Sequence, residues 1–238
     1  MDILKLNRIP TKHIVNFRSL GGYAAGDSHV TRHGVFYRSG WMSDASPSEI
    51  DIIKELGIKT VIDLRSAPEL EKLPSNLSLD GEFNYKHIDL MSKLNPGELI
   101  KQISSKEDME KFNLSDLYKY LVDNEQEGIY KIFEAIAENV EKGAVFYHCS
   151  AGKDRTGITS MFLLSIAEVK TLDIIANYEV SSTYIQSHGE GKMMGSAPQN
   201  MIEILFYLKE KYGSAVDYLK SIGVSQNQLD TIRNVFLE

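Results

Sequence analysis

The chain has 238 residues, and its 17 glycines and 6 prolines are too few for a collagen-like or low-complexity chain. At this length a fold buries roughly 70–75% of the surface that its unfolded chain exposes, which allows one sizeable core. The 26 basic and 33 acidic residues leave a formal net charge of −7. This balance argues against nucleic acid as a partner, so an anionic ligand needs a local basic site.

One cysteine excludes an internal disulfide and a zinc cluster built from several cysteines. The opening residues, MDILKLNRIP, contain no basic segment followed by an apolar one, and the chain has no apolar run of about 18 residues. We therefore expect one domain over residues 1–238, located in the cytoplasm, without stable membrane insertion. Export that uses no leader is compatible with the same features.

Strand-length segments rich in β-branched and aromatic residues are predicted in the first half at 35–38, 59–64 and 84–90. Residues 92–125 show no strand pattern, and we expect there an insertion of short, weakly amphipathic helices that could act as a lid. Between the first two strands a helix is predicted from its end signals. Ser46 is the expected N-cap, with Pro47 in the first turn, Glu49 completing a capping box and Gly57 at the end.

The second half is predicted to be mostly helical around one buried strand. Apolar residues recur at helical spacing over 128–140, and the strand AVFYH follows at 144–148. A turn of small residues then leads into an apolar helix. Further helices are predicted at 171–187, 198–212 and 225–237. Strands that alternate with helices predict an α/β fold, with a central, mostly parallel sheet flanked by helices.

The turn after the strand at 144–148 carries the clearest chemical pattern, reading HCSAGKDRTG from His148 to Gly157. Five residues separate Cys149 from Arg155, enough for a loop whose backbone N–H groups all turn inward and bind a tetrahedral dianion at a helix N-terminus. Arg155 would close this ring with a bidentate grip on two phosphate oxygens. The same positive field favours a thiolate, so Cys149 is predicted to be a nucleophile toward phosphorus.

Other loop residues have predicted parts in holding the phosphate: Ser150, Ala151, Gly152, Lys153 and Thr156. Lys153 would contact the substrate or lie on the solvated surface. Thr156 would either hydrogen-bond the thiolate or cap the helix. His148 would either fix the loop by hydrogen bonding or be an ordinary core histidine, and a lone cysteine outside such a loop is usually a buried structural thiol.

Charged side chains also follow the other predicted strands. Arg38, Asp63 with Arg65, and Asp89 fall at the carboxyl ends of strands, the edge where ligands bind in open parallel sheets. We expect Arg38 and Arg65 to bind phosphate. The alternative is that they form structural ion pairs with Asp63 or Glu69.

A leaving alkoxide or phenoxide needs a proton, so a general acid is expected. Asp154 is the first candidate, because it lies inside the loop next to Arg155. Asp89 is the alternative, since it follows a strand and precedes the expected lid. Asp63 is the third candidate.

The residues of this chain do not match other ligand-binding motifs. Gly152-Lys153 is followed by Asp, and no glycine stands five positions before Gly152, so the loop is not of the Walker A type. A dinucleotide-binding pattern at 189–191 lacks its third glycine. His29 and His33 are four residues apart, but Gly34 follows directly and no helix is predicted there, so no metal site is expected.

The HCSAGKDRTG segment resembles the Cys-x5-Arg loop of protein tyrosine and dual-specificity phosphatases, and its Ala-Gly-Lys is similar to tensin-type phosphoinositide phosphatases. Further segments resemble a bacterial family of tyrosine and phosphoinositide phosphatases: NFRSLGGY at 16–23, YRSG at 37–40, DLRS at 63–66 with Glu69, and YEVSSTYI at 178–185. The resemblance implies a dual-specificity-phosphatase-like fold and hydrolysis through a phosphocysteine intermediate. It also implies no metal or organic cofactor, and it supports Asp154 as the acid.

Two departures from related families qualify the expected substrate. Trp41 is followed by Met-Ser-Asp, so the Trp-Pro-Asp loop of mammalian tyrosine phosphatases is missing, and Ser150 replaces the first loop lysine of the tensin type. We expect phosphotyrosine as the main substrate, with phosphoserine, phosphothreonine or phosphoinositide as further ones, and phosphate or vanadate as active-site anions. The alternatives are a non-catalytic phosphate- or phosphoprotein-binding module and a sulfur transferase with a persulfide on Cys149.

Overall fold

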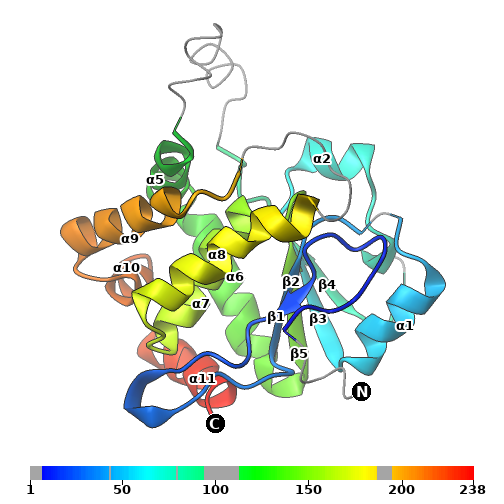
Figure 1. The fold of residues 1–238 in the computed structure, drawn as a ribbon, viewed down its shortest axis with the longest axis horizontal. Coiled ribbons are helices and arrows are strands. Elements are labelled where there is room, and N and C mark those ends of the chain that lie inside the picture. Colours follow the sequence, from blue (N-terminus) through cyan, green and yellow to red (C-terminus); the bar gives the residue numbers. More distant parts are fainter. Residues whose placement is uncertain (1–6, 43, 79, 94–112, 187–194) are drawn as a thin grey trace, which may run out of the picture.

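The computed structural model describes residues 7–42, 44–78, 80–93, 113–186 and 195–238. Its centre is a five-stranded sheet in the order β1-β2-β5-β3-β4 (Figure 1). The strands are β1 (Arg18–Ser19), β2 (Phe36–Ser39), β3 (Ile58–Asp63), β4 (Asn84–His87) and β5 (Ala144–His148). All neighbouring strands are parallel except β1, which pairs antiparallel with β2. The predicted α/β class with a mostly parallel central sheet is confirmed.

Helices cover both faces of this sheet (Figure 1). They are α1 (Pro47–Glu55), α2 (Ala67–Lys72), α5 (Leu114–Asn124), α6 (Gln126–Asn139), α7 (Asp154–Ile166), α8 (Thr171–Gln186), α9 (Pro198–Tyr212), α10 (Ala215–Ser221) and α11 (Gln226–Phe236). Among the described residues, no helix has the length and apolar composition needed to cross a membrane.

The central strand β5 separates two hydrophobic cores because successive side chains of a strand point to opposite faces. Val145 and Tyr147 belong to the larger core, which is shared with α5, α6, α7, α9, α10 and α11. Ala144 and Phe146 belong to the smaller core under α1. The strand is therefore buried along its whole length, and its carboxyl end delivers the following loop to the edge of the sheet.

The predicted start of α1 is confirmed in detail. Ser46 and Glu49 form the capping box, Pro47 is in the first turn, and Gly57 follows the helix with a φ of +71°. The last helix likewise begins with a capping box, between Ser225 and Gln228.

Some elements differ from the prediction. The strand expected over 84–90 ends at His87, and β1, α2 and α10 were not predicted. Of the helical insertion expected over 92–125, the structure describes α5, an amphipathic helix whose N-cap Asn113 accepts a hydrogen bond from the Ser115 backbone. Residues 94–112 of the expected lid lie outside the described residues.

Candidate active site

The predicted phosphate loop joins β5 to α7, and Cys149 at its start is only 1% exposed. Gly152 has a φ of +66°, in the left-handed region. A Cβ atom at this position would lie 2.3 Å from the Gly40 backbone nitrogen and 2.4 Å from the Ser39 oxygen. Only glycine fits, and the loop can therefore pack against the end of β2 directly before the N-terminus of α7.

Two buried side chains hold the loop by a carbonyl group. Arg38 Nη2 donates a hydrogen bond to the Gly152 oxygen at 2.7 Å, and Asn16 Nδ2 donates to the same oxygen at 2.8 Å. The Trp41 backbone N–H likewise donates a hydrogen bond to the Ser150 oxygen, at 2.7 Å. All three donors bond carbonyl oxygens of the loop, and none of them uses its backbone N–H groups.

Arg38 does not take the phosphate-binding place expected from the sequence. Its side chain is fully buried, and its second terminal nitrogen, Nη1, donates to Asn177 Oδ1 of α8 at 2.8 Å. Both terminal nitrogens are thus committed to groups behind the loop. The physical reason is that β2 lies directly beside β5, so a side chain at its end meets the outer face of the loop.

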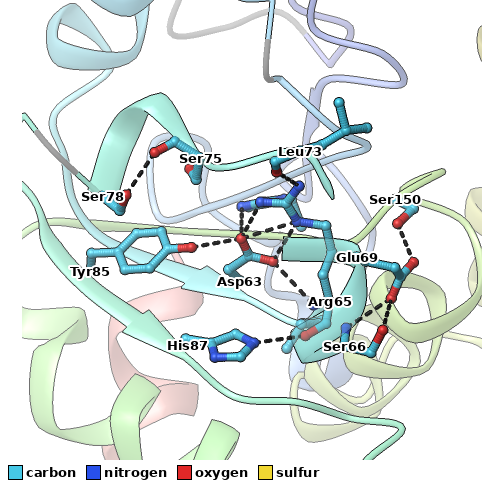
Figure 2. Close-up of polar contacts among 12 residues, drawn as sticks. Asp63, Arg65, Ser66, Glu69, Leu73, Ser75, Ser78, Tyr85, His87 and Ser150 are labelled. Carbon is cyan, nitrogen blue, oxygen red and sulfur yellow. Dashed lines mark hydrogen bonds and ion pairs between the residues drawn. The ribbon is translucent and has the colours of Figure 1, made fainter. Parts of the chain in front are cut away.

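Arg65 takes the alternative position, a structural ion pair with Asp63 (Figure 2). Its Nε lies 2.9 and 3.1 Å from the two carboxylate oxygens, and its Nη2 lies 2.6 Å from Oδ2. Its Nη1 donates to the Leu73 oxygen at 2.6 Å. Every nitrogen of this guanidinium is therefore engaged with the protein.

Asp63 itself is fully buried and carries several donors. Tyr85 donates its O–H to Oδ2 at 2.6 Å, and His148 Nε2 lies 3.5 Å from the same oxygen. Burial raises the pKa of Asp63, but His148, Arg65 and Tyr85 lower it more, to well below its usual range. Asp63 is thus an ionised structural anion. His148 is fully buried, and burial lowers its pKa.

Arg155 is held by Glu69 through two parallel bonds. Its Nη1 and Nη2 donate to Glu69 Oε2 and Oε1, at 2.6 and 2.8 Å. Burial lowers the pKa of Arg155, but the hydrogen bond to Glu69 and the charge of Cys149 raise it above its ordinary value. Glu69 also accepts bonds from the Ser66 backbone and hydroxyl and from the Ser150 hydroxyl (Figure 2).

Asp154 begins α7 and has a 26% exposed side chain. Its Oδ1 accepts a hydrogen bond from Tyr118 at 2.5 Å and one from Lys153 Nζ at 2.8 Å. Lys153 is 2% exposed, which places its ammonium inside the site and not on the solvated surface. Tyr178 lies beside Tyr118, with their hydroxyl oxygens 2.6 Å apart.

The remaining predicted residues have separate places. Asp89 accepts bonds from the Met91 backbone at 2.8 Å and from the Ala67 backbone at 3.2 Å, so its carboxylate caps α2. Thr156 is fully buried in the first turn of α7, and its hydroxyl bonds no group among the described residues. Among the described residues, the Thr156 hydroxyl therefore does not cap the helix.

The charges around the loop are unevenly compensated. Three cations each have a carboxylate partner: Arg155 with Glu69, Lys153 with Asp154, and Arg65 with Asp63. Arg18 and Arg38, both fully buried, have no carboxylate within ion-pair distance among the described residues. Arg18 instead donates to the Asn177 oxygen and the Ser181 hydroxyl. These two guanidinium groups leave a net positive charge behind the loop, which suits a bound dianion.

Four further residues contact the site and are not among those expected from the sequence: Asn16, Arg18, Tyr118 and Asn177. Asn16, Arg18 and Asn177 lie in or next to segments that resemble the bacterial phosphatases, and this was the available indication. For Tyr118 no sequence indication existed, because it occupies an ordinary buried position of an amphipathic helix.

Comparison with known proteins identifies the family to which this chain is similar. A family profile described as "Tyrosine phosphatase family" matches residues 9–238. The chain is 32% identical over 219 residues to the tyrosine-protein phosphatase of Nostoc commune, covering 83% of this chain and 72% of that protein. It is 22% identical over 272 residues to the triple specificity protein phosphatase PtpB of Mycobacterium tuberculosis, covering 93% and 96%. Among solved structures, P. aeruginosa TpbA is similar with a TM-score of 0.40 and 12% identity, covering 87% of this chain and 88% of that one.

The profile match includes the whole sheet, the Cys149–Arg155 loop and the helices around it. The Nostoc relative matches most of both chains at an identity that shows common family membership. On these grounds the chain belongs to the tyrosine phosphatase family and is a protein tyrosine phosphatase.

Proposed function

We propose that the chain hydrolyses phosphomonoesters through a phosphocysteine intermediate on Cys149. The observation that carries this proposal is the placement of Cys149 at the buried end of β5, where the loop to α7 and the Glu69-held Arg155 follow directly. A cysteine sulfur can act as a nucleophile toward phosphorus where a helix N-terminus and a guanidinium beside it can hold the phosphoryl oxygens.

The first step forms a bond between Cys149 Sγ and phosphorus and breaks the bond from phosphorus to the ester oxygen. The leaving oxygen takes a proton from Asp154. In the second step a water molecule attacks phosphorus and gives its proton to the Asp154 carboxylate. The sulfur–phosphorus bond breaks, which releases phosphate and restores the thiolate.

The phosphoryl oxygens would be held by backbone N–H groups of residues 150–155 and by Arg155. Bonds of this kind stabilise the charge that develops on the oxygens in the transition state. In this scheme Lys153 lies beside the acid, since its ammonium donates to Asp154 Oδ1 at 2.8 Å.

Asp154 is the acid that the surroundings favour over the two alternatives. Asp63 is ionised, fully buried and bonded to Arg65 and Tyr85. Asp89 is bonded to two backbone N–H groups, one of them at the start of α2. Asp154 is partly exposed and directly precedes Arg155, so its carboxyl group can reach a leaving oxygen.

We further propose phosphotyrosine as the main substrate, with phosphoserine, phosphothreonine or phosphoinositide as further ones. The printed names of the Nostoc and Mycobacterium relatives, a tyrosine-protein phosphatase and a triple specificity protein phosphatase, support this range. Phosphate and vanadate are expected to compete with the substrate, since the loop would bind either tetrahedral oxyanion.

The test is phosphate release from phosphotyrosine and phosphoserine peptides and from phosphoinositides, by the wild type and by Cys149→Ser. We expect no turnover by the serine variant, because a serine hydroxyl stays protonated at neutral pH, together with retained binding of a phosphotyrosine peptide. Phosphate release by Cys149→Ser near the wild-type rate would contradict the covalent mechanism.

A further inference from the structure

Tyr118 connects the acid to two helices that are distant in the sequence. It comes from α5, and its hydroxyl contacts Asp154 Oδ1 at 2.5 Å and the Tyr178 hydroxyl of α8 at 2.6 Å. Asn200 of α9 extends the chain of contacts, with its Nδ2 donating to the Tyr178 hydroxyl at 3.4 Å. Tyr118 is fully buried, and Tyr178 is nearly so.

The direction of the hydrogen bonds in this chain follows from the groups at its ends. The Asn200 amide nitrogen can only donate, so the Tyr178 oxygen accepts there and its proton is free for Tyr118. As a carboxylate, Asp154 can only accept, and Tyr118 donates to its Oδ1. Burial raises the pKa of both tyrosines, which keeps their hydroxyl groups protonated. All donors therefore point toward Asp154.

The two carboxylate oxygens of Asp154 are used differently. Oδ1 accepts from Tyr118 and from Lys153, whereas no described residue bonds Oδ2. A proton on the carboxyl group would therefore reside on Oδ2. After its transfer, Tyr118 and Lys153 stabilise the carboxylate that remains.

Tyr178 can lie close to α7 because of one glycine in that helix. A Cβ atom at Gly157 would lie 3.2 Å from Tyr178 Cδ2, closer than most such contacts. Gly157 therefore lets the ring of Tyr178 lie against the first turns of α7, which brings its hydroxyl within reach of Tyr118. The ring contact between Tyr118 and Tyr178 is edge-on, with centroids 6.0 Å apart.

We propose that Tyr118 is a positioning residue for the general acid: it fixes Asp154 Oδ1 and leaves Oδ2 to deliver the proton to the leaving oxygen. This inference rests on the proposed function, in which Asp154 is the acid. The titratable and charged groups that face Asp154 within the described part of the chain are Lys153, Arg155, Tyr118 and Tyr178. Tyr118 is the one that connects the acid to α5.

Tyr118→Phe removes the hydroxyl and keeps the ring. We expect kcat/KM for a phosphotyrosine peptide, whose leaving group needs a proton, to fall about tenfold. For p-nitrophenyl phosphate, whose leaving group departs without much protonation, kcat/KM should stay within about twofold. The basic limb of the pH profile for the peptide should move to higher pH by about one unit, because the carboxylate has lost a donor.

Tyr218→Phe is the matched control. Tyr218 is also a fully buried tyrosine, and its hydroxyl donates to the Val122 oxygen of the same helix α5 at 2.7 Å. Its loss should not change the ratio of the two kcat/KM values or the pH profile. Tyr178→Phe, which removes the donor to Tyr118, should give the Tyr118→Phe pattern in weaker form and serves as the test if Tyr118→Phe does not fold.

The outcomes separate this inference from the proposed function. An equal loss on both substrates, an unchanged peptide rate, or an unmoved basic limb in Tyr118→Phe would overturn the positioning role. Asp154→Asn is measured in parallel: if it shows the leaving-group dependence and Tyr118→Phe does not, only the role of Tyr118 fails. If Asp154→Asn itself shows none, the assignment of the acid fails, and the role of Tyr118 fails with it.

Discussion

The carboxylate of Glu69 holds the guanidinium of Arg155 with both of its oxygens, at 2.6 and 2.8 Å. Oε2 of the same carboxylate accepts bonds from the backbone and hydroxyl of Ser66, which makes Glu69 part of the capping box that starts α2. The orientation of the loop arginine is therefore fixed by a carboxylate that is itself fixed by a helix start.

Glu69→Gln keeps the size of this side chain and removes its charge. We expect kcat/KM for p-nitrophenyl phosphate to fall by about 10- to 100-fold, because Arg155 loses its bidentate partner and with it its orientation toward the phosphoryl oxygens. Steady-state kinetics at neutral pH measures the effect. Glu71→Gln, at an exposed position of the same helix, is the control and should match the wild type. A Glu69→Gln enzyme as active as that control would contradict the positioning of Arg155 by Glu69.

Asp154→Asn should lower turnover of substrates with poor leaving groups by about 10²–10³, the usual contribution of general acid catalysis. The loss should shrink for aryl phosphates with acidic leaving groups. Asp89→Asn should show a flat dependence on the leaving group, since that carboxylate is bonded to backbone N–H groups at α2. Rates on a series of aryl phosphates of graded leaving-group acidity distinguish the Asp154→Asn variant from the Asp89→Asn variant. A steep dependence in Asp89→Asn with a flat one in Asp154→Asn would transfer the role to Asp89.

Arg38→Met should weaken binding of phosphate by about tenfold, measured as the inhibition constant of inorganic phosphate. The reason is the loss of a buried charge behind the loop together with the hydrogen bond to the Gly152 oxygen. Arg38→Lys keeps the charge and should give a smaller effect. Arg32→Met, at a half-exposed arginine that donates to the Leu237 oxygen, is the control. Unchanged inhibition by phosphate in Arg38→Met would show that this guanidinium adds nothing to anion binding.

Glu49 allows a prediction on stability that is independent of catalysis. Burial raises the pKa of Glu49, but the backbone and side chain of His13 and of Ser46 lower it more, from 4.5 to about 2. A lowered pKa in the folded state means that the stabilisation is complete above about pH 4.5 and is lost as the pH falls toward 2. A pKa difference of this size corresponds to about 3 kcal/mol at neutral pH.

Glu49→Gln should therefore lower the free energy of unfolding by about 2–3 kcal/mol at pH 7, and the difference from the wild type should narrow steadily below pH 4.5. Urea unfolding at a series of pH values measures it. Glu55→Gln, at an exposed position of the same helix, should leave the stability unchanged. A difference that stays constant down to pH 3 would show that Glu49 acts through packing and not through its charge.

Features that depend on neighbouring residues could be predicted from the sequence. The strand at 144–148 was predicted with the bounds that the structure shows, and so was the helix at 198–212. The capping box of Ser46 and Glu49 was also correct, because its two bonds connect residues only three positions apart. The pattern of the Cys149–Arg155 loop was also recognisable, since its residues follow one another between a strand and a helix, but the groups that hold the loop, among them Arg38 and Asn16, come from other parts of the chain.

The partners of the long charged side chains could not be predicted in this way. Arg38 and Arg65 follow parallel strands and were equally compatible with phosphate binding and with structural pairs. Only the tertiary structure shows Arg65 on Asp63 and Arg38 on the Gly152 oxygen. The choice depends on which acceptor lies within a few ångströms once the strands are side by side, and strand order is not encoded in any local pattern.

The same distinction applies to Asp154, the proposed acid. The sequence by itself determined that Asp154 lies next to Arg155 at the start of a helix, because this needs only adjacency in the chain. The tertiary structure alone decided that Tyr118, 36 residues earlier, donates to its Oδ1 and that Glu69, 86 residues before Arg155, holds the arginine. Hydrogen bonds and ion pairs act over about 3 Å, so packing of distant helices against the sheet selects such partners.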